Sequence, residues 1–171
     1  MIIWLIGLSG SGKTTLAEKV VEIVRAEKRQ VVLLDGDRVR ELFGGDLGYG
    51  IEDRRKSAQR MCNFCEFLDN QGIDVICAFL SIFPESRNWC RDNLSSYYEV
   101  FIDTPIQYLK KRDSKGLYAR YARGEVNNVV GIDLEFVVPT SPDLTIVNDG
   151  GISGLLSHAP KIADQILNVR L

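Results

Sequence analysis

Short apolar runs alternate with longer segments of helical periodicity along most of the chain. The apolar runs have the length and composition of buried strands, and they cover residues 2–6, 31–34, 75–80, 100–102 and 144–147. Apolar positions that recur every three or four residues predict helices over 14–28, 37–43, 53–70, 84–94, 105–112 and 153–168. This alternation predicts an α/β fold with three layers, in which a parallel sheet of about five strands has helices on both faces. Ligands of such folds bind beyond the carboxyl ends of the strands.

Length and charge narrow the class of protein. A chain of 171 residues predicts one domain spanning residues 1–171. A net charge of −2 gives no general attraction to nucleic acid or to an anionic membrane, so we expect neither as a partner. The apolar start lacks a basic segment and is too short for a signal sequence, and no apolar run approaches transmembrane length. We therefore expect a cytoplasmic protein.

Four cysteines, at positions 62, 65, 77 and 90, allow two interpretations. The Cys62-x-x-Cys65 spacing could belong to a redox or zinc site, but the single histidine, His158, is far along the chain. The pair also lies within a helical pattern, on the apolar face. We expect buried, reduced cysteines that act as small hydrophobic residues.

A glycine-rich motif connects the first predicted strand to the first predicted helix. Residues 7–14 read Gly-Leu-Ser-Gly-Ser-Gly-Lys-Thr, which is the phosphate-binding P-loop pattern. Its glycines let backbone N–H groups surround phosphate oxygens, Lys13 supplies a positive charge, and Thr14 supplies a hydroxyl for Mg²⁺. A chance glycine-rich turn is the alternative, but the strand and the helix on either side argue against it. The sequence therefore predicts a P-loop NTPase fold that binds a nucleoside triphosphate.

Two carboxylates follow the second predicted strand. In Asp35-Gly36-Asp37, the side chains are placed to assist a metal ion and to orient or deprotonate an attacking hydroxyl. Turn formation is the simpler explanation of such a triplet. Arg40 and Arg54 are candidates for holding an anionic second substrate, although a salt-bridged exposed helix face would also explain the arginines at 54, 55 and 60.

Residues 113–140 break the regular alternation. The segment is basic, glycine-punctuated and weakly periodic. In a phosphoryl-transfer enzyme we expect such a segment to form a mobile lid over the phosphates. A solvated surface loop is the alternative.

Motifs spread over residues 2 to about 148 resemble the adenylylsulfate kinase family in order and spacing. They are the P-loop with Thr15, Leu34-Asp-Gly-Asp-Arg-Val-Arg40, Asp46-Leu-Gly-Tyr49, Glu52-Asp-Arg54, Ala78-Phe-Leu-Ser81, Val100-Phe-Ile-Asp-Thr-Pro105, Arg112-Asp-Ser-Lys-Gly-Leu-Tyr118, Ala122-Arg-Gly-Glu125, Gly131-Ile-Asp133 and Pro142-Asp-Leu144. The resemblance implies a P-loop kinase that uses MgATP to phosphorylate the 3′-hydroxyl of a small nucleotide, adenosine 5′-phosphosulfate, giving PAPS. It also implies a homodimer.

The resemblance assigns roles on both sides of the transferred phosphate. Asp35 and Thr14 would hold the metal, and Asp37 would face the 3′-hydroxyl. Lys13, Asp35, Asp37 and Ser81 are the candidate catalytic residues, although capping of a strand end explains Ser81 equally well. Residues expected at ATP are Gly7, Ser9, Gly10, Ser11, Gly12, Lys13, Thr14, Thr15, Arg112 and Asn148. Residues expected at the acceptor are Asp37, Arg40, Tyr49, Arg54, Ser57, Leu80, Ser81, Lys115, Asn128 and Val129.

The chain departs from the family pattern around the acceptor base. Ser57 stands where the family has asparagine, and Val129 stands where a family phenylalanine forms half of an aromatic sandwich around adenine. Ile82 also replaces a family proline. Loss of a stacking partner costs about 1–3 kcal/mol per base, which is enough to change specificity. Cytidine diphosphoramidate, the acceptor of related kinases, is therefore an alternative within the same reaction type.

A regulatory GTPase or a nucleotide-gated binding module is a more distant alternative. The chain has no Asn-Lys-x-Asp guanine signature, and it retains Lys13 and Asp37. Both observations favour a kinase.

Overall fold

A single parallel sheet organises the computed structural model, which describes residues 1–168. Its strands are β1 (Ile2–Ile6), β2 (Val31–Asp35), β3 (Asp74–Ala78), β4 (Tyr97–Asp103) and β5 (Leu144–Val147). They lie in the order β2-β3-β1-β4-β5, and every pair of neighbours is parallel. The predicted α/β fold with five parallel strands is confirmed. Within the described residues, no helix is long and apolar enough to cross a membrane.

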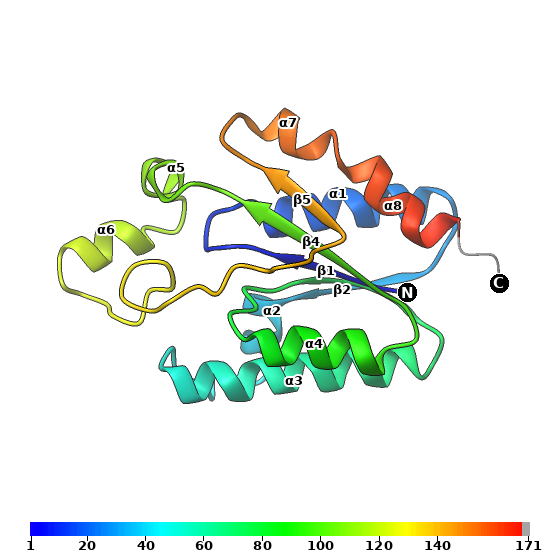
Figure 1. Ribbon diagram of the computed structural model, residues 1–171, viewed down its shortest axis with the longest axis horizontal. Coiled ribbons are helices and arrows are strands. Elements are labelled where there is room, and N and C mark those ends of the chain that lie inside the picture. Colours follow the sequence, from blue (N-terminus) through cyan, green and yellow to red (C-terminus); the bar gives the residue numbers. More distant parts are fainter. Residues whose placement is uncertain (169–171) are drawn as a thin grey trace.

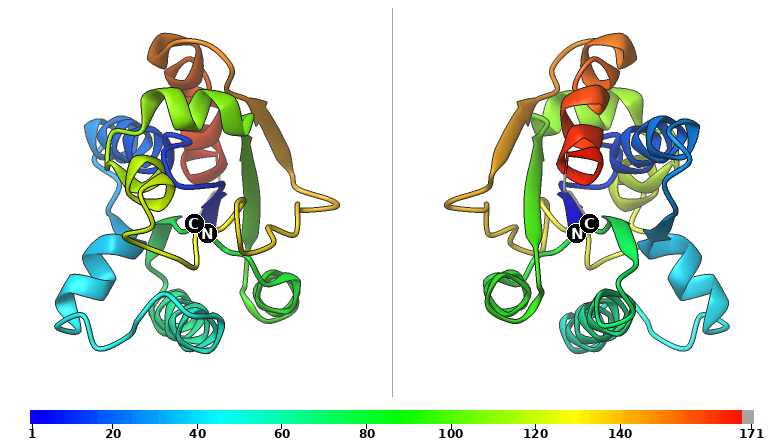
Figure 2. Two further views of the ribbon diagram at one scale, coloured as in Figure 1. Left: turned by 90° about the vertical axis from the view of Figure 1, so that its left-hand side faces the viewer. Right: turned by 90° about the vertical axis from the view of Figure 1, so that its right-hand side faces the viewer.

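Helices cover both faces of the sheet (Figures 1 and 2). On one face lie α1 (Lys13–Ala26), α7 (Ile152–Leu156) and α8 (Ala159–Leu167), and on the other lie α3 (Ile51–Asp69) and α4 (Pro84–Asn93). Each face has its own apolar core, so the central strands are buried on both sides. All five residues of β1 are buried, and each fully buried isoleucine or leucine contributes about 1.5–3 kcal/mol. This burial explains why the strand reads as a continuous apolar run.

The remaining helices follow the carboxyl ends of strands, and two of them, α5 and α6, lie at the left of Figure 1. They are α2 (Gly36–Leu42), α5 (Ile106–Arg112) and α6 (Leu117–Ala122). The short helix α6 lies inside the segment 113–140, which we call the lid, and the sequence did not predict it. The carboxylate of Asp113 accepts hydrogen bonds from the backbone N–H groups of Tyr118 (3.1 Å) and Ala119 (2.8 Å), which stabilises the start of this helix.

Several element boundaries differ from the sequence prediction by a few residues, including the start of β4 at Tyr97 rather than at 100, and two of the differences have a clear local cause. The helix predicted over 153–168 is two helices, α7 and α8, and this part of the prediction is wrong. Pro160 lies in the first turn of α8 and has no N–H to continue the preceding helix, while the Ser157 hydroxyl donates to the carbonyl of Gly154 (2.7 Å). Strand β3 ends at Ala78 rather than at 80, because the chain turns there into the loop before α4.

All four cysteines are buried free thiols, as predicted. The Cys90 thiol donates to the Cys62 sulfur at 3.6 Å, between α4 and α3. Burial raises the pKa of the Cys77 thiol well above its usual value. Across residues 1–168, no group of three or more histidine, cysteine or acidic side chains is arranged to hold a metal ion.

Candidate active site

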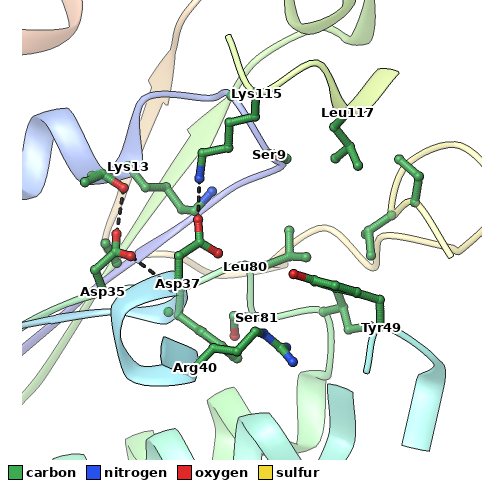
Figure 3. A pocket seen from close by; sticks show the side chains of 18 of the residues that line it. Ser9, Lys13, Asp35, Asp37, Arg40, Tyr49, Leu80, Ser81, Lys115 and Leu117 are labelled. Carbon is green, nitrogen blue, oxygen red and sulfur yellow. Dashed lines mark hydrogen bonds and ion pairs between the residues drawn. The ribbon is translucent and has the colours of Figure 1, made fainter. Parts of the chain in front are cut away.

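A cavity of about 1120 Å³ opens beyond the carboxyl ends of the strands. The P-loop, α2, α3, the loop 79–83 and the lid all contribute to its walls, and Figure 3 shows how their side chains converge. Nearly all the predicted site residues line it, namely Ser9, Gly10, Gly12, Lys13, Thr14, Thr15, Asp35, Asp37, Arg40, Tyr49, Arg54, Ser57, Leu80, Ser81, Arg112, Lys115, Asn128, Val129 and Asn148. Gly7 and Ser11 are buried and lie outside this lining. One cavity thus contains both predicted halves of the site.

The P-loop backbone depends on its glycines. Gly12 has φ 97°, and a Cβ atom there would lie 2.4 Å from Leu155 Cδ2. A Cβ on Gly7 would lie 2.6 Å from Ser11 Oγ and 2.8 Å from the carbonyl oxygen of Ile102. A side chain at Gly7 would displace backbone, and one at Gly12 would strain the positive φ and push Leu155 aside. The motif that the sequence identified is therefore a packing requirement as well as a phosphate-binding pattern.

Lys13 folds back onto the loop that precedes it. Its ammonium group donates to the carbonyls of Gly7 (2.8 Å) and Leu8 (2.9 Å). Burial, together with the charge of Lys115, lowers the pKa of Lys13 to about 8. An anion in the cavity would oppose both effects and would favour the charged ammonium.

Thr14 and Asp35 lie side by side, as the metal-site prediction requires. The Thr14 hydroxyl donates to Asp35 Oδ2 at 2.6 Å. The other carboxylate oxygen, Oδ1, accepts from the backbone N–H groups of Asp37 (2.9 Å) and Arg38 (3.3 Å), and so caps the start of α2. One buried carboxylate thus joins the P-loop helix to α2 and presents oxygen ligands toward the phosphate side.

Asp37 projects into the cavity from the first turn of α2, toward Lys115 of the lid (Figure 3). Lys115 Nζ donates to Asp37 Oδ2, and both side chains remain more than half exposed. This hydrogen bond raises the pKa of Lys115. The lid therefore contacts the predicted catalytic carboxylate.

Two arginines and one tyrosine, all predicted acceptor residues, form one wall of the cavity. The guanidinium carbons of Arg40 and Arg54 lie 4.7 Å and 5.6 Å from the ring centre of Tyr49, whose side chain is exposed. Arg54 donates to the carbonyls of Tyr49 (2.8 Å) and Asn128 (2.8 Å), which connects α3 to the lid. The salt-bridged surface explanation applies instead to Arg55 and Arg60, which pair with Glu85 and Asp46.

Position 129 is part of a small apolar core. Val129 is 2% exposed and packs in a cluster with Leu109 and Tyr118. The position touches the cavity, but valine offers no aromatic face there. The preceding residue, Asn128, adopts φ 60°, which is uncommon for a residue other than glycine.

The loop 79–83 carries Leu80 and Ser81 into the cavity. We call it the acceptor loop because both residues are predicted to meet the acceptor. Ser81 is 2% exposed and has φ 51°. Among residues 1–168, its hydroxyl has no hydrogen-bond partner, whereas its carbonyl accepts from Arg87 at 2.7 Å. A buried hydroxyl at the cavity wall is thus left available to a ligand.

Arg112 and Asn148 lie together behind the P-loop. Arg112 donates to the carbonyl of Gly150 (2.6 Å) and to the side-chain oxygen of Asn148 (3.3 Å). Asn148 in turn donates to the carbonyl of Ser11 (2.8 Å) and is 4% exposed. This chain of contacts connects the segment after β5 to the phosphate loop.

Several cavity residues were missed by the sequence analysis. The lining also includes Phe79, Phe83, Ser114, Leu117, Arg120, Val126, Asn127, Ile152 and Leu155. Tyr118 donates its hydroxyl to the carbonyl of Ser9 (3.0 Å) and so joins the lid to the P-loop. The only sequence signal for this contact was the Arg112-to-Tyr118 motif, which did not reveal its partner.

Comparisons with known proteins agree with this geometry. The sequence profile of a family described as adenylylsulphate kinase matches residues 1–147. A cytidine diphosphoramidate kinase of Campylobacter jejuni is 40% identical over 147 residues, covering 86% of this chain and 85% of the relative. An adenylyl-sulfate kinase of Yersinia pestis is 37% identical over 160 residues, covering 92% of this chain and 75% of the relative.

The solved structures that resemble this chain include kinases of the same family. The Mycobacterium tuberculosis APS kinase in complex with AMPPNP and APS superposes with a TM-score of 0.88 at 32% identity, covering 97% of this chain and 96% of that chain. A shikimate kinase from Aquifex aeolicus, with a TM-score of 0.56 at 16% identity, shares the fold. The distant alternatives, a GTPase or a non-kinase binding module, find no support. The chain belongs to the adenylylsulphate kinase family and is an ATP-dependent nucleotide kinase.

Proposed function

We propose that the chain transfers the γ-phosphate of ATP to the 3′-hydroxyl of adenosine 5′-phosphosulfate, giving PAPS and ADP. The observation that carries the proposal is the single cavity in which Asp37 lies between the P-loop and the wall formed by Arg40, Tyr49 and Arg54. A donor phosphate on the P-loop and an acceptor against that wall would both face Asp37. The likeness to a kinase solved with APS and an ATP analogue supports this assignment.

Mg²⁺ fits the pair formed by Thr14 and Asp35. Both offer oxygen ligands, which Mg²⁺ prefers, and they lie 2.6 Å apart at the start of the P-loop helix. When bound, the ion would neutralise charge on the transferred phosphate. Lys13, released from the carbonyls of Gly7 and Leu8, would supply a second positive charge to the outer phosphates.

Asp37 would orient the acceptor hydroxyl and take its proton. The bond between the 3′-oxygen and the γ-phosphorus forms as the bond from that phosphorus to the bridging oxygen of ADP breaks. One oxygen of Asp37 is held by Lys115, and the carboxylate is more than half exposed, so an acceptor can reach it. Arg40 and Arg54 would hold the anionic 5′ group and the ribose of the acceptor, and Lys115 would reach the acceptor from the lid.

Cytidine diphosphoramidate is the second candidate acceptor. Val129 packs into an apolar cluster and cannot stack on adenine, so the acceptor base would have Tyr49 alone as its aromatic partner. A pyrimidine depends less on a two-sided aromatic slot, and the Campylobacter jejuni relative is named for this substrate. This acceptor would use the same Asp37 and the same P-loop.

A direct comparison of the two acceptors tests the proposal. The protein is incubated with MgATP and each acceptor, and ADP and the 3′-phosphorylated product are followed to obtain kcat/KM. Turnover of adenosine 5′-phosphosulfate with the larger kcat/KM supports the leading proposal. Turnover of the cytidine compound alone would replace it with the second candidate, and ATP hydrolysis without either product would contradict both.

We further propose that residues 1–171 form one kinase domain with its lid at 113–140, and that the protein acts as a cytoplasmic homodimer. One continuous sheet supports the single domain. ATP use and four free thiols fit a reducing compartment. Light scattering of the purified protein measures the oligomeric state, and a monomer at micromolar concentration would contradict the dimer.

A further inference from the structure

Arg87 is a buried cation that the proposed chemistry does not use. It lies in α4, outside the cavity, and is only 6% exposed. Burying a guanidinium is costly unless its N–H groups find acceptors. Burial lowers its pKa, and Glu99, itself 4% exposed, is the strongest opposing charge. Because Arg87 is buried, it does not serve solubility at the surface, and its role must lie in the contacts that it makes.

The hydrogen bonds of Arg87 connect two separate parts of the site. Nη1 donates to the carbonyl of Ser81 in the acceptor loop (2.7 Å). Nη2 donates to the carbonyl of Val137 (3.1 Å), which lies on the segment by which the lid returns to the sheet. Next to Val137, Phe136 packs on Phe101 of β4 with ring centres 6.0 Å apart. The two nitrogens of the planar guanidinium reach both carbonyls at once. The single ammonium nitrogen of a lysine has no such rigid fork.

The acceptor loop needs such support. Ser81 adopts φ 51°, a left-handed conformation that costs about 1–2 kcal/mol for a residue with a side chain. Its hydroxyl is buried at the cavity wall without a partner among residues 1–168. A strained residue with an available hydroxyl indicates that the surrounding structure holds Ser81 in place for a ligand.

We propose that Arg87 is a positioning residue that holds the acceptor loop and the returning end of the lid in register, so that Ser81 and Leu80 meet the acceptor nucleotide. Arg87 touches neither substrate and acts through the carbonyls of Ser81 and Val137. Its loss should weaken the acceptor site and leave the ATP site, on the far side of Asp37, largely unchanged. The inference rests on the proposed function, since it assigns the loop to the acceptor.

Arg91, one turn later on α4, provides a matched control. It also reaches the end of the lid connection, through Asp143 (3.0 Å), but it is exposed and makes no hydrogen bond to the acceptor loop within the described residues. The variants Arg87→Met, Arg87→Lys and Arg91→Met separate the loop contact from the general loss of an arginine on this helix. Thermal melting identifies variants that fold.

Steady-state kinetics then give the decisive comparison, with the acceptor that the wild-type protein turns over. We expect Arg87→Met to raise the KM for the acceptor about tenfold or more, with the KM for ATP within about twofold of wild type. Arg87→Lys should restore part of the loss, and Arg91→Met should behave as wild type. An unchanged acceptor KM in folded Arg87→Met, or equal increases for both substrates, would overturn the proposal.

Hydrogen exchange tests the same contact without turnover. Amides of residues 79–82 and 136–138 should exchange faster in Arg87→Lys than in the wild type, while residues 79–82 are unaffected in Arg91→Met. Unchanged exchange in both segments would overturn the role of Arg87, and so would failure of both Arg87 variants to fold, since the residue would then serve the fold alone. If the wild-type protein phosphorylates neither acceptor, the proposed function fails, and the exchange result still decides whether Arg87 holds the loop.

Discussion

The Asp35 carboxylate performs two tasks that two substitutions can separate. Its Oδ1 caps α2 through the N–H groups of Asp37 and Arg38, and its Oδ2 accepts from Thr14. Asp35→Ala removes both. Loss of a helix cap costs about 1 kcal/mol, and loss of the Thr14 hydrogen bond costs about 1 kcal/mol more. We therefore expect a loss of about 2 kcal/mol in the free energy of unfolding.

The expected change in melting temperature follows from the size of the chain. In a domain of this length, 1 kcal/mol corresponds to about 2–4 °C, so Asp35→Ala should melt about 4–8 °C below the wild type. Asp35→Asn keeps an oxygen for the cap and should melt within about 3 °C of the wild type, because asparagine caps helices as well as aspartate does. It lacks the negative charge that favours Mg²⁺ at this position.

The assay measures stability and metal dependence in parallel. Differential scanning calorimetry gives the melting temperatures, and turnover is measured over a range of Mg²⁺ concentrations. We expect Asp35→Asn to be stable but to need much more Mg²⁺ and to lose at least about 100-fold in kcat/KM, since metal-assisted charge stabilisation contributes several kcal/mol. Wild-type Mg²⁺ dependence in Asp35→Asn would refute the metal role, and wild-type stability of Asp35→Ala would refute the capping role.

Three further predictions follow from the same cavity. Asp37→Asn should leave the ATP KM near wild type and reduce kcat about 100-fold or more, because it removes a proton acceptor and keeps the geometry; near-normal kcat in a steady-state assay would exclude Asp37 as the base. The pKa of Lys13 is about 8, below the ordinary value of 10.5, so above pH 8 Lys13 is increasingly neutral in the free protein. Binding of a phosphate then requires Lys13 to take up a proton. ATP affinity should therefore fall as pH rises from 8 to 10, with proton uptake on binding in calorimetry using two buffers, and a pH-independent affinity would contradict this. The double variant Val129→Phe, Ser57→Asn should raise the ratio of kcat/KM for the adenosine acceptor to kcat/KM for the cytidine acceptor about tenfold. It should also lower the melting temperature, because position 129 is tightly packed. No change of the ratio in a competition assay would show that other residues select the base.

The parts of the site that follow local rules were predictable from the sequence. The P-loop glycines, Thr14 and the Asp35-Gly36-Asp37 turn lie at the ends of strands that periodicity identifies, and a parallel sheet brings those ends together. Family motifs added the residues of the acceptor wall. The predicted end of β3 and the predicted single last helix were wrong, because a turn and a proline override apolar periodicity there.

Contacts between distant segments could not be read from the sequence. The hydrogen bonds from Tyr118 to Ser9 and from Arg87 to Val137 join segments 109 and 50 residues apart, and no periodic pattern encodes such pairs. The packing of Val129 against Leu109 likewise depends on how the lid packs on α5. These contacts connect the lid to the P-loop and to the acceptor loop, and so they determine how the two halves of the site meet.

The most direct test of the central claim is to identify the bond that the enzyme makes. The protein is incubated with MgATP and adenosine 5′-phosphosulfate, and the products are examined by phosphorus NMR. The account predicts equal amounts of ADP and of a new phosphomonoester coupled to the ribose 3′-hydrogen, and formation of both at least about 100-fold more slowly with Asp37→Asn. Release of inorganic phosphate, or a phosphomonoester at any other position, would contradict it.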